Sequence, residues 1–126
     1  MDRIFLGLAA ASFFVFGVAS FIQPADVLGG VGVEFAGEYG IYEARGIYGG
    51  VSLGLATLFA MGAFRSDYRR PALFALLAYA GGYVAARFAA APLDGAPEGL
   101  FLTFVGFEIF LAAGAALFLA RSRSAD

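Results

Sequence analysis

Four long apolar runs dominate the chain, and the first of them carries no charge over residues 4–22. A helix needs about 20 predominantly apolar residues to cross a bilayer, so this run has the length of one span. Gln23 and Pro24 end it, because proline cannot continue the hydrogen-bond ladder of a helix. A signal peptide is the rival interpretation, with Arg3 as its basic start and residues 18–20 as its cleavage site. The run is longer than a signal-peptide core and no soluble domain follows it, so we expect it to be retained.

Three further helices are predicted over residues 42–64, 72–91 and 100–120. They are separated by a glycine-rich first loop, a basic hinge over residues 65–71 and a polar loop that starts at Pro92. Pro71 suits the first turn of the third helix. The fold class that follows is an all-α membrane protein, an up-and-down bundle of four transmembrane helices that forms a single domain over residues 1–126.

The composition supports a membrane protein and narrows its chemistry. Hydrophobic residues make up 61% of the 126 residues and charged residues only 14%. A soluble domain of this size cannot bury so much apolar surface. The net charge of −2 argues against a nucleic-acid partner. The chain has no His, Lys or Cys, which disfavours haem, retinal and thiolate metal sites, so no cofactor is predicted.

Charge placement predicts the orientation of the bundle. Six of the eight arginines fall on one side of the predicted hairpins and five loop carboxylates fall on the other. The positive-inside rule then places both termini in the cytoplasm, and we expect a multi-pass protein in the inner membrane of a bacterium. The arginines are Arg3, Arg65, Arg69, Arg70, Arg121 and Arg123, and the carboxylates are Asp26, Glu34, Glu38, Asp94 and Glu98.

Four ionisable residues lie within or at the edges of the predicted spans: Glu43, Arg45, Arg87 and Glu108. A charge at the bilayer centre costs about 2.5–3.5 kcal/mol on insertion scales, so such residues are seldom kept without a partner or a function. All four are expected in the outer half of the bundle, where either Arg45 or Arg87 can offer its planar fork to Glu108. With Tyr48 and Tyr83 these side chains predict a polar pocket.

The same residues have plainer interpretations. Arg45 and Arg87 lie near helix ends and can extend to lipid head groups. Glu108 can be a structural partner that fixes helix register. A proton relay is a further alternative, but it needs a chain of groups, and only tyrosines and Ser52 are near.

A strip of glycines follows Glu43. Gly46, Gly50 and Gly54 are spaced by four, and Gly49 lies beside them. This spacing lets helix backbones approach closely, so packing within the bundle is expected, with self-association as the alternative.

The segment Glu43-Ala44-Arg45-Gly46-Ile47-Tyr48-Gly49-Gly50, followed by Gly54, resembles the motif Glu-x-Arg-x-x-Tyr-Gly-Gly of a bacterial family of short four-helix membrane proteins. That family is catalogued as domain of unknown function 4345. Arg87, the Asp94-Gly95 pair and Glu108 are also similar to it. The resemblance covers essentially the whole chain and implies a four-helix bundle with a shared polar site at Glu43, Arg45, Tyr48, Arg87 and Glu108. It implies no activity.

Three functions follow as hypotheses. The leading one is a non-enzymatic accessory or scaffold subunit that packs against lipids or a larger membrane complex. The second is a binder or carrier of an anionic lipid, a quinone or a carboxylate in the pocket of Arg45, Arg87 and Glu108. The third is an enzyme that uses a carboxylate pair for acid–base chemistry, for which Glu43 and Glu108 are the only embedded candidates.

Overall fold

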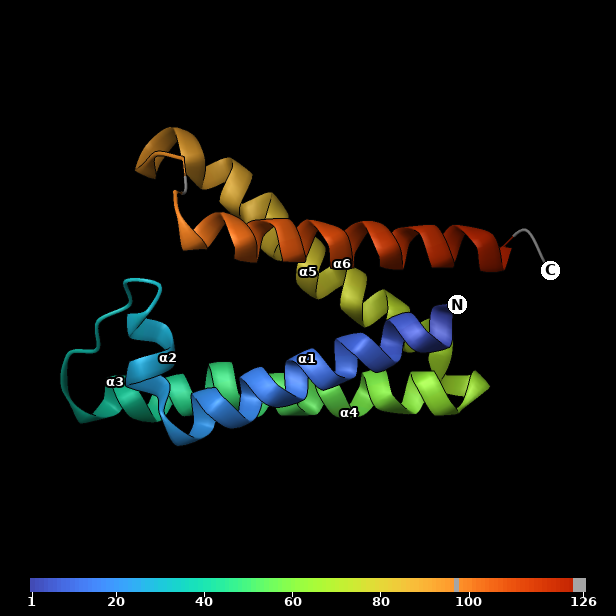
Figure 1. The fold of residues 1–126 in the computed structure, drawn as a ribbon, viewed down its shortest axis with the longest axis horizontal. Coiled ribbons are helices and arrows are strands. Elements are labelled where there is room, and N and C mark those ends of the chain that lie inside the picture. Colours follow the sequence, from blue (N-terminus) through green and yellow to red (C-terminus); the bar gives the residue numbers. More distant parts are fainter. Residues whose placement is uncertain (97, 124–126) are drawn as a thin grey trace.

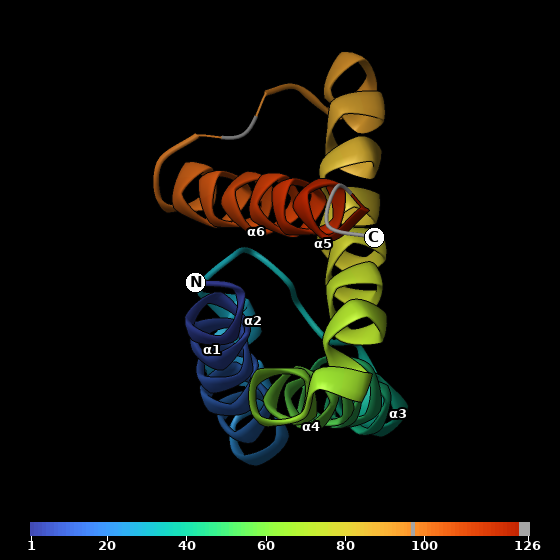
Figure 2. The same ribbon diagram turned by 90° about the vertical axis from the view of Figure 1, so that its right-hand side faces the viewer.

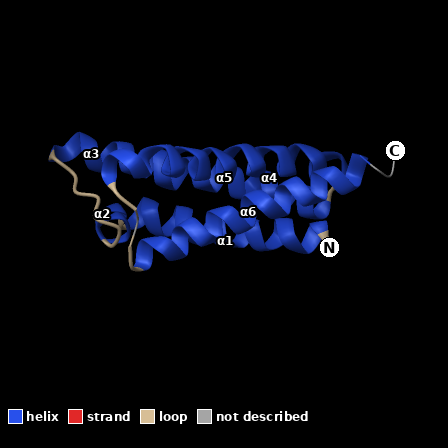
Figure 3. Ribbon diagram, turned by 90° about the horizontal axis from the view of Figure 1, so that it is seen from above, coloured by secondary structure: helices blue, strands red, loops and turns tan. Residues whose placement is uncertain are grey.

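The computed structural model describes residues 1–96 and 98–123, apart from the side chains of Glu38, Leu100, Ser122 and Arg123. Two residues of the predicted charge pattern, Glu38 and Arg123, therefore lie outside the described side chains. The described chain is helical, without a strand (Figure 3). Its elements are α1 (Asp2–Ile22), α2 (Pro24–Gly29), α3 (Gly37–Ala44), the π-helix η1 (Arg45–Gly50), α4 (Val51–Phe64), α5 (Ser66–Asp94) and α6 (Leu100–Arg123).

Four helices are long and apolar enough to cross a membrane: Asp2–Ile22, Tyr39–Phe64, Ser66–Asp94 and Phe101–Arg121. The second of these is continuous through α3, η1 and α4. The structure therefore contains the four long apolar helices that the sequence predicts, and it corrects several of their ends.

The predicted hinge over residues 65–71 is reduced to Arg65, the one residue between α4 and α5. Pro71 lies in the second turn of α5 rather than the first, where its missing N–H removes only one helical hydrogen bond. Residues 92–94 of the loop predicted to start at Pro92 are also helical. Helix α5 ends at Asp94, and the next residue, Gly95, adopts a φ of +90° that side chains disfavour. The first loop contains two short helices, α2 and α3.

The helices form two antiparallel pairs. Helix α1 lies along α4, α5 crosses diagonally from α4 towards α6, and α6 lies against α5 (Figures 1 and 2). Both termini and the α4–α5 connection lie at one end, which we call the arginine end because Arg3, Arg65, Arg69, Arg70 and Arg121 lie there (Figure 1). The opposite end, with Asp26, Glu34, Asp94 and Glu98, is called the acidic end.

The hydrophobic core lies in the half of the molecule nearest the arginine end, where all four long helices contribute. Phe5 of α1 packs on Phe110 and Phe118 of α6, with ring centroids 5.8 and 5.3 Å apart. Its ring also fills the space left by Gly114. The core residues are Phe5, Leu6, Ala9, Ala10, Phe13, Ala56, Phe59, Ala63, Ala72, Leu73, Leu76, Ala80, Leu111, Ala115 and Leu119.

Towards the acidic end the two pairs separate. In α5, no described residue beyond Ala80 is buried, and in α6 none before Leu111 is. Helix α1 stays packed on the continuous helix of Tyr39–Phe64, and Gly17, Ser20, Gly49 and Ser52 are buried between them. The fold is thus closed at the arginine end and open between the pairs at the acidic end.

Gly62 provides a test of this packing. A Cβ atom at Gly62 would lie 2.6 Å from the Cβ of Ala72, whereas a Cβ at Gly54 on the same helix would meet nothing within 4 Å. We predict that Gly62→Ala lowers the free energy of unfolding by about 1–3 kcal/mol through overpacking. Gly54→Ala should leave it unchanged or raise it by up to about 1 kcal/mol, because alanine favours helix. Unfolding in dodecyl sulfate followed by circular dichroism measures both, and equal effects would contradict the packing described.

Candidate functional site

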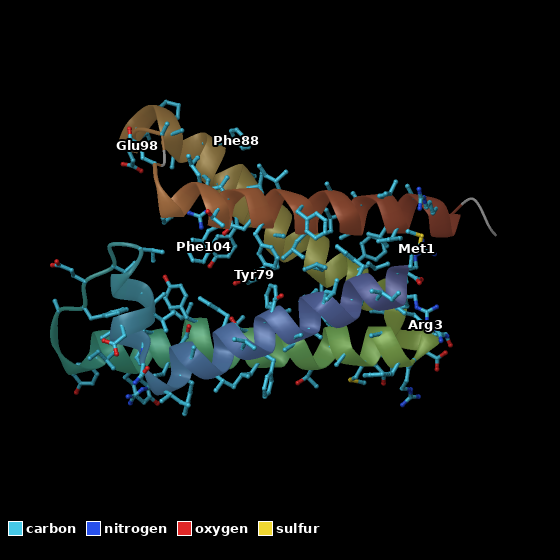
Figure 4. All side chains as sticks on the ribbon, viewed as in Figure 1. Met1, Arg3, Tyr79, Phe88, Glu98 and Phe104 are labelled. Carbon is cyan, nitrogen blue, oxygen red and sulfur yellow. The ribbon has the colours of Figure 1, made fainter. Side chains whose placement is uncertain are left out.

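A pocket of about 480 Å³ occupies the space between the two helix pairs in the acidic half. Its walls come from α1, from α2 and the loop after it, from η1, and from α5 and α6. Of the seventeen described residues that line it, eight are aromatic and only Arg87 and Glu108 are charged. Figure 4 shows Tyr79 and Phe104 within this space, between α6 and α1.

Arg87 of α5 and Glu108 of α6 form a bidentate ion pair in the pocket wall. The guanidinium donates from Nε to Oε2 over 2.6 Å and from Nη2 to Oε1 over 2.8 Å. The two side chains are 25% and 16% exposed. Parallel N–H···O bonds of this kind combine charge with fixed geometry, so the pair holds α5 and α6 in one register.

Aromatic rings surround the guanidinium of Arg87. Its central carbon lies 4.5 Å from the ring centroid of Phe101 and 5.5 Å from that of Tyr83. Both distances are within the range of cation–π attraction. The rings replace much of the water around the charge, which strengthens the pairing with Glu108.

A line of hydroxyl-bearing side chains runs from the ion pair towards α4. Tyr79 and Tyr83 have ring centroids 5.0 Å apart, and Tyr79 packs edge-on to Phe13 at 5.1 Å. Next to Tyr79 lies Ser52 of α4, which is 1% exposed and does not line the pocket. The pocket therefore combines apolar walls with polar groups concentrated on α5 and α6.

The structure brings four of the six predicted polar residues into this pocket: Tyr48, Tyr83, Arg87 and Glu108. Of the two predicted pairings it contains Arg87–Glu108. Glu43 and Arg45 are exposed and do not line the pocket, so the proposed site of Arg45 and the carboxylate pair of Glu43 with Glu108 do not form.

The π-helix explains why Arg45 points elsewhere. In a regular α-helix Arg45 and Gly49 would lie on one face, since residues four apart share a face. In η1 the hydrogen bonds span five residues, so Gly49 shares its face with Ala44 instead. Ala44 is 2% exposed and Gly49 is buried against Phe21 of α1, which leaves Arg45 on the outside.

The sequence did not predict that apolar residues of the first loop cover the pocket, or that aromatic residues of α6 form one of its walls. The structure places four apolar residues of the first loop in the lining. They are Val27, Leu28, Val31 and Val33. Phe101, Phe104 and Glu108 of α6 also line the pocket, and their spacing of three and four residues is the signal that identifies a shared helix face.

The glycine strip does not pack within the bundle, contrary to the expectation. A Cβ at Gly46 or Gly54 would meet nothing within 4 Å, and one at Gly50 would approach only the carbonyl of Arg45 at 3.9 Å. Gly49 alone makes a close approach, because a Cβ added there would lie 2.9 Å from the Cβ of Phe21. The strip spaced by four is therefore an open face of the helix Tyr39–Phe64.

The sequence profile of a protein family described as "Domain of unknown function (DUF4345)" matches residues 1–119. The chain belongs to this family. No curated protein and no solved structure matches the chain.

The ion pair can be tested by a double-mutant cycle. We predict that Arg87→Met or Glu108→Met alone destabilises the fold by on the order of 3 kcal/mol, because each leaves an unpaired charge in an apolar pocket. The double variant should be more stable than either single variant, since no charge remains. Thermal unfolding in detergent measures all three. Arg45→Met, at an exposed cation, is the control and should stay within about 0.5 kcal/mol of the parent. Additive single effects would contradict the coupling.

Proposed function

We propose that the chain is a multi-pass protein of a bacterial inner membrane and that it binds a small amphipathic molecule in the pocket between its helix pairs. The four long apolar helices support the membrane assignment. The five arginines with described side chains at the arginine end support an orientation with both termini in the cytoplasm. The pocket then lies in the outer half of the bilayer.

The observation that carries this proposal is an ion pair in the wall of an otherwise apolar and aromatic pocket. Ligand sites are typically concave, about 300–1,000 Å³ in volume, and lined by apolar side chains with a few convergent polar groups. The pocket of about 480 Å³ has this composition. Helix packing alone would fill such a space with side chains, whereas here α5 and α6 are held away from α1 over half their length.

The depth of the polar groups indicates an amphipathic ligand. At 1.5 Å per residue, Glu108 lies about 12 Å from the start of α6 and Arg87 about 10 Å from the end of α5. A ligand in the pocket would place its polar group at this depth and its apolar body against the aromatic walls. A molecule that partitions into the bilayer reaches such a site from the lipid phase.

Filling the pocket should remove the ligand without unfolding the protein. Ser12 lines the pocket and its neighbour Ala11 is exposed, so Ser12→Phe adds a ring inside the pocket and Ala11→Phe adds the same ring outside it. We predict that native mass spectrometry of protein extracted from its own membranes in mild detergent shows one stoichiometric small molecule. Ser12→Phe should lower its occupancy at least fivefold and Ala11→Phe should not. A parent protein without any such molecule contradicts the proposal.

A second candidate function is an accessory or scaffold subunit of a larger membrane complex, which the open glycine strip favours. Gly46 and Gly54 have no neighbour within 4 Å on an exposed face of the second span. Small residues four apart allow another helix to approach closely in a membrane. Gly46, Gly50 and Gly54 do not line the pocket, so a partner subunit on this face and a ligand in the pocket are compatible.

The strip is tested by native gel electrophoresis of the solubilised membrane. We predict that the parent protein migrates in a larger complex, and that Gly46→Leu with Gly54→Leu shifts it to the size of the isolated chain. Gly7→Leu on α1, where a Cβ would also meet nothing within 4 Å, is the control and should leave migration unchanged. A parent protein that migrates alone would exclude the accessory role for this face.

A further inference from the structure

The charges of the pocket identify the kind of ligand that it can hold. Arg87 and Glu108 are the only charged residues among the described ones that line the pocket, and they neutralise each other through two hydrogen bonds. An anionic ligand would have to displace Glu108 from the guanidinium or lie beside it, and either arrangement leaves an unpaired or repelled carboxylate in an apolar space. A cationic ligand faces the same difficulty with Arg87. The pocket therefore suits a neutral molecule.

The hydrogen-bonding capacity of Arg87 adds a second constraint. A guanidinium has five N–H groups, and Glu108 takes two of them, one at Nε and one at Nη2. Within the described part of the chain, Arg87 donates to no other side chain. Arg87 has no acceptor atom, so a ligand can bond to the remaining N–H groups only if it offers lone pairs, such as those of a carbonyl or ether oxygen.

The aromatic walls add a third constraint. Phe101 and Tyr83 pack around the guanidinium, and Phe104 and Phe107 continue the aromatic surface on α6. Aromatic side chains prefer offset stacking or edge contacts with flat rings. The valines of the first loop, Val27, Val31 and Val33, provide a purely apolar wall at another side of the pocket.

We infer that the pocket binds a neutral, flat ring compound with carbonyl or ether oxygens and an apolar tail, which is the chemistry of a membrane quinone. Its ring oxygens accept hydrogen bonds from the free N–H groups of Arg87, its ring packs against the aromatic wall, and its tail lies along the valines. This inference rests on the proposed function and narrows the class of ligand. It excludes anionic lipids and carboxylates, which an unpaired arginine in the pocket would favour.

Tryptophan fluorescence tests the inference directly, since the chain has no tryptophan and a single substitution gives a single reporter. Phe104 lines the pocket, whereas Phe88 is 67% exposed on the outer side of α5 (Figure 4). The full-length Phe104→Trp protein in detergent is titrated with decylubiquinone as the neutral probe and with dodecanoate as the anionic probe. Phe88→Trp in the same micelles measures quenching by collision alone.

We expect decylubiquinone to quench Phe104→Trp to saturation at micromolar concentration and to quench Phe88→Trp only in proportion to its concentration. Dodecanoate at tenfold excess should not relieve the saturable quenching. In the Phe104→Trp background, the Arg87→Met/Glu108→Met double change should weaken decylubiquinone binding at least tenfold, because the donors are lost. The probe preference of the protein with its ion pair intact tests the inference even if the double variant does not fold.

Different outcomes would contradict the quinone inference and the proposed binding function. If dodecanoate displaces decylubiquinone, or if the co-purified ligand is anionic, the inference of a neutral ring compound is wrong. The proposal of a ligand-binding pocket would still stand. A folded double variant that binds decylubiquinone as tightly as the parent overturns the role of Arg87. The absence of saturable quenching by either probe, together with the absence of any co-purified molecule, overturns the proposed function itself.

Discussion

The Arg87–Glu108 ion pair joins α5 to α6 in the half of the molecule where neither helix has a buried described residue. At the arginine end these helices are held by the shared core, in which Leu76, Leu111 and Ala115 are inaccessible or nearly so. Beyond that core the pair is the interaction that keeps α5 and α6 in register, because two parallel hydrogen bonds fix both distance and orientation. The width of the pocket depends on this pair, since α6 carries one wall and α5 another.

The half of the fold at the arginine end provides most of the packing, and the half at the acidic end contains the pocket. The closed half buries side chains of all four long helices, and close approaches at Gly62 and Gly114 allow them to interdigitate. The open half lacks that burial and contains instead a cavity between the helix pairs. The distribution of packing therefore supports a binding site in the open half on grounds independent of its charges.

Hydropathy and charge placement predicted the four long apolar helices, because spans must be continuous and apolar over a nearly fixed length. The Arg87–Glu108 pair was one of two pairings that the sequence allowed. The choice between them depended on the π-helix, whose hydrogen bonds span five residues and turn Arg45 outward, and no residue pattern in the α-helical period signals that change. The cover formed by Val27 and Leu28 was missed for a similar reason. Short apolar stretches rich in glycine are compatible with an interfacial loop, and only tertiary contact decides that they fold back over a pocket.

A purely structural link between α5 and α6 would be served as well by apolar side chains of similar volume, because a buried ion pair gains little net stability over such a replacement. Unlike an apolar contact, an ion pair leaves some hydrogen-bond donors of the arginine available to other groups. With Glu108 bound at Nε and Nη2, Arg87 retains donors that no other described side chain takes, and Phe101 and Tyr83 keep them in a largely apolar space. Glu108 thus balances the charge of Arg87 while leaving hydrogen-bond donors available, which is the combination that recognition of a neutral oxygen acceptor within a membrane requires. The same two residues that set the helix register therefore provide the specificity that we propose for the pocket.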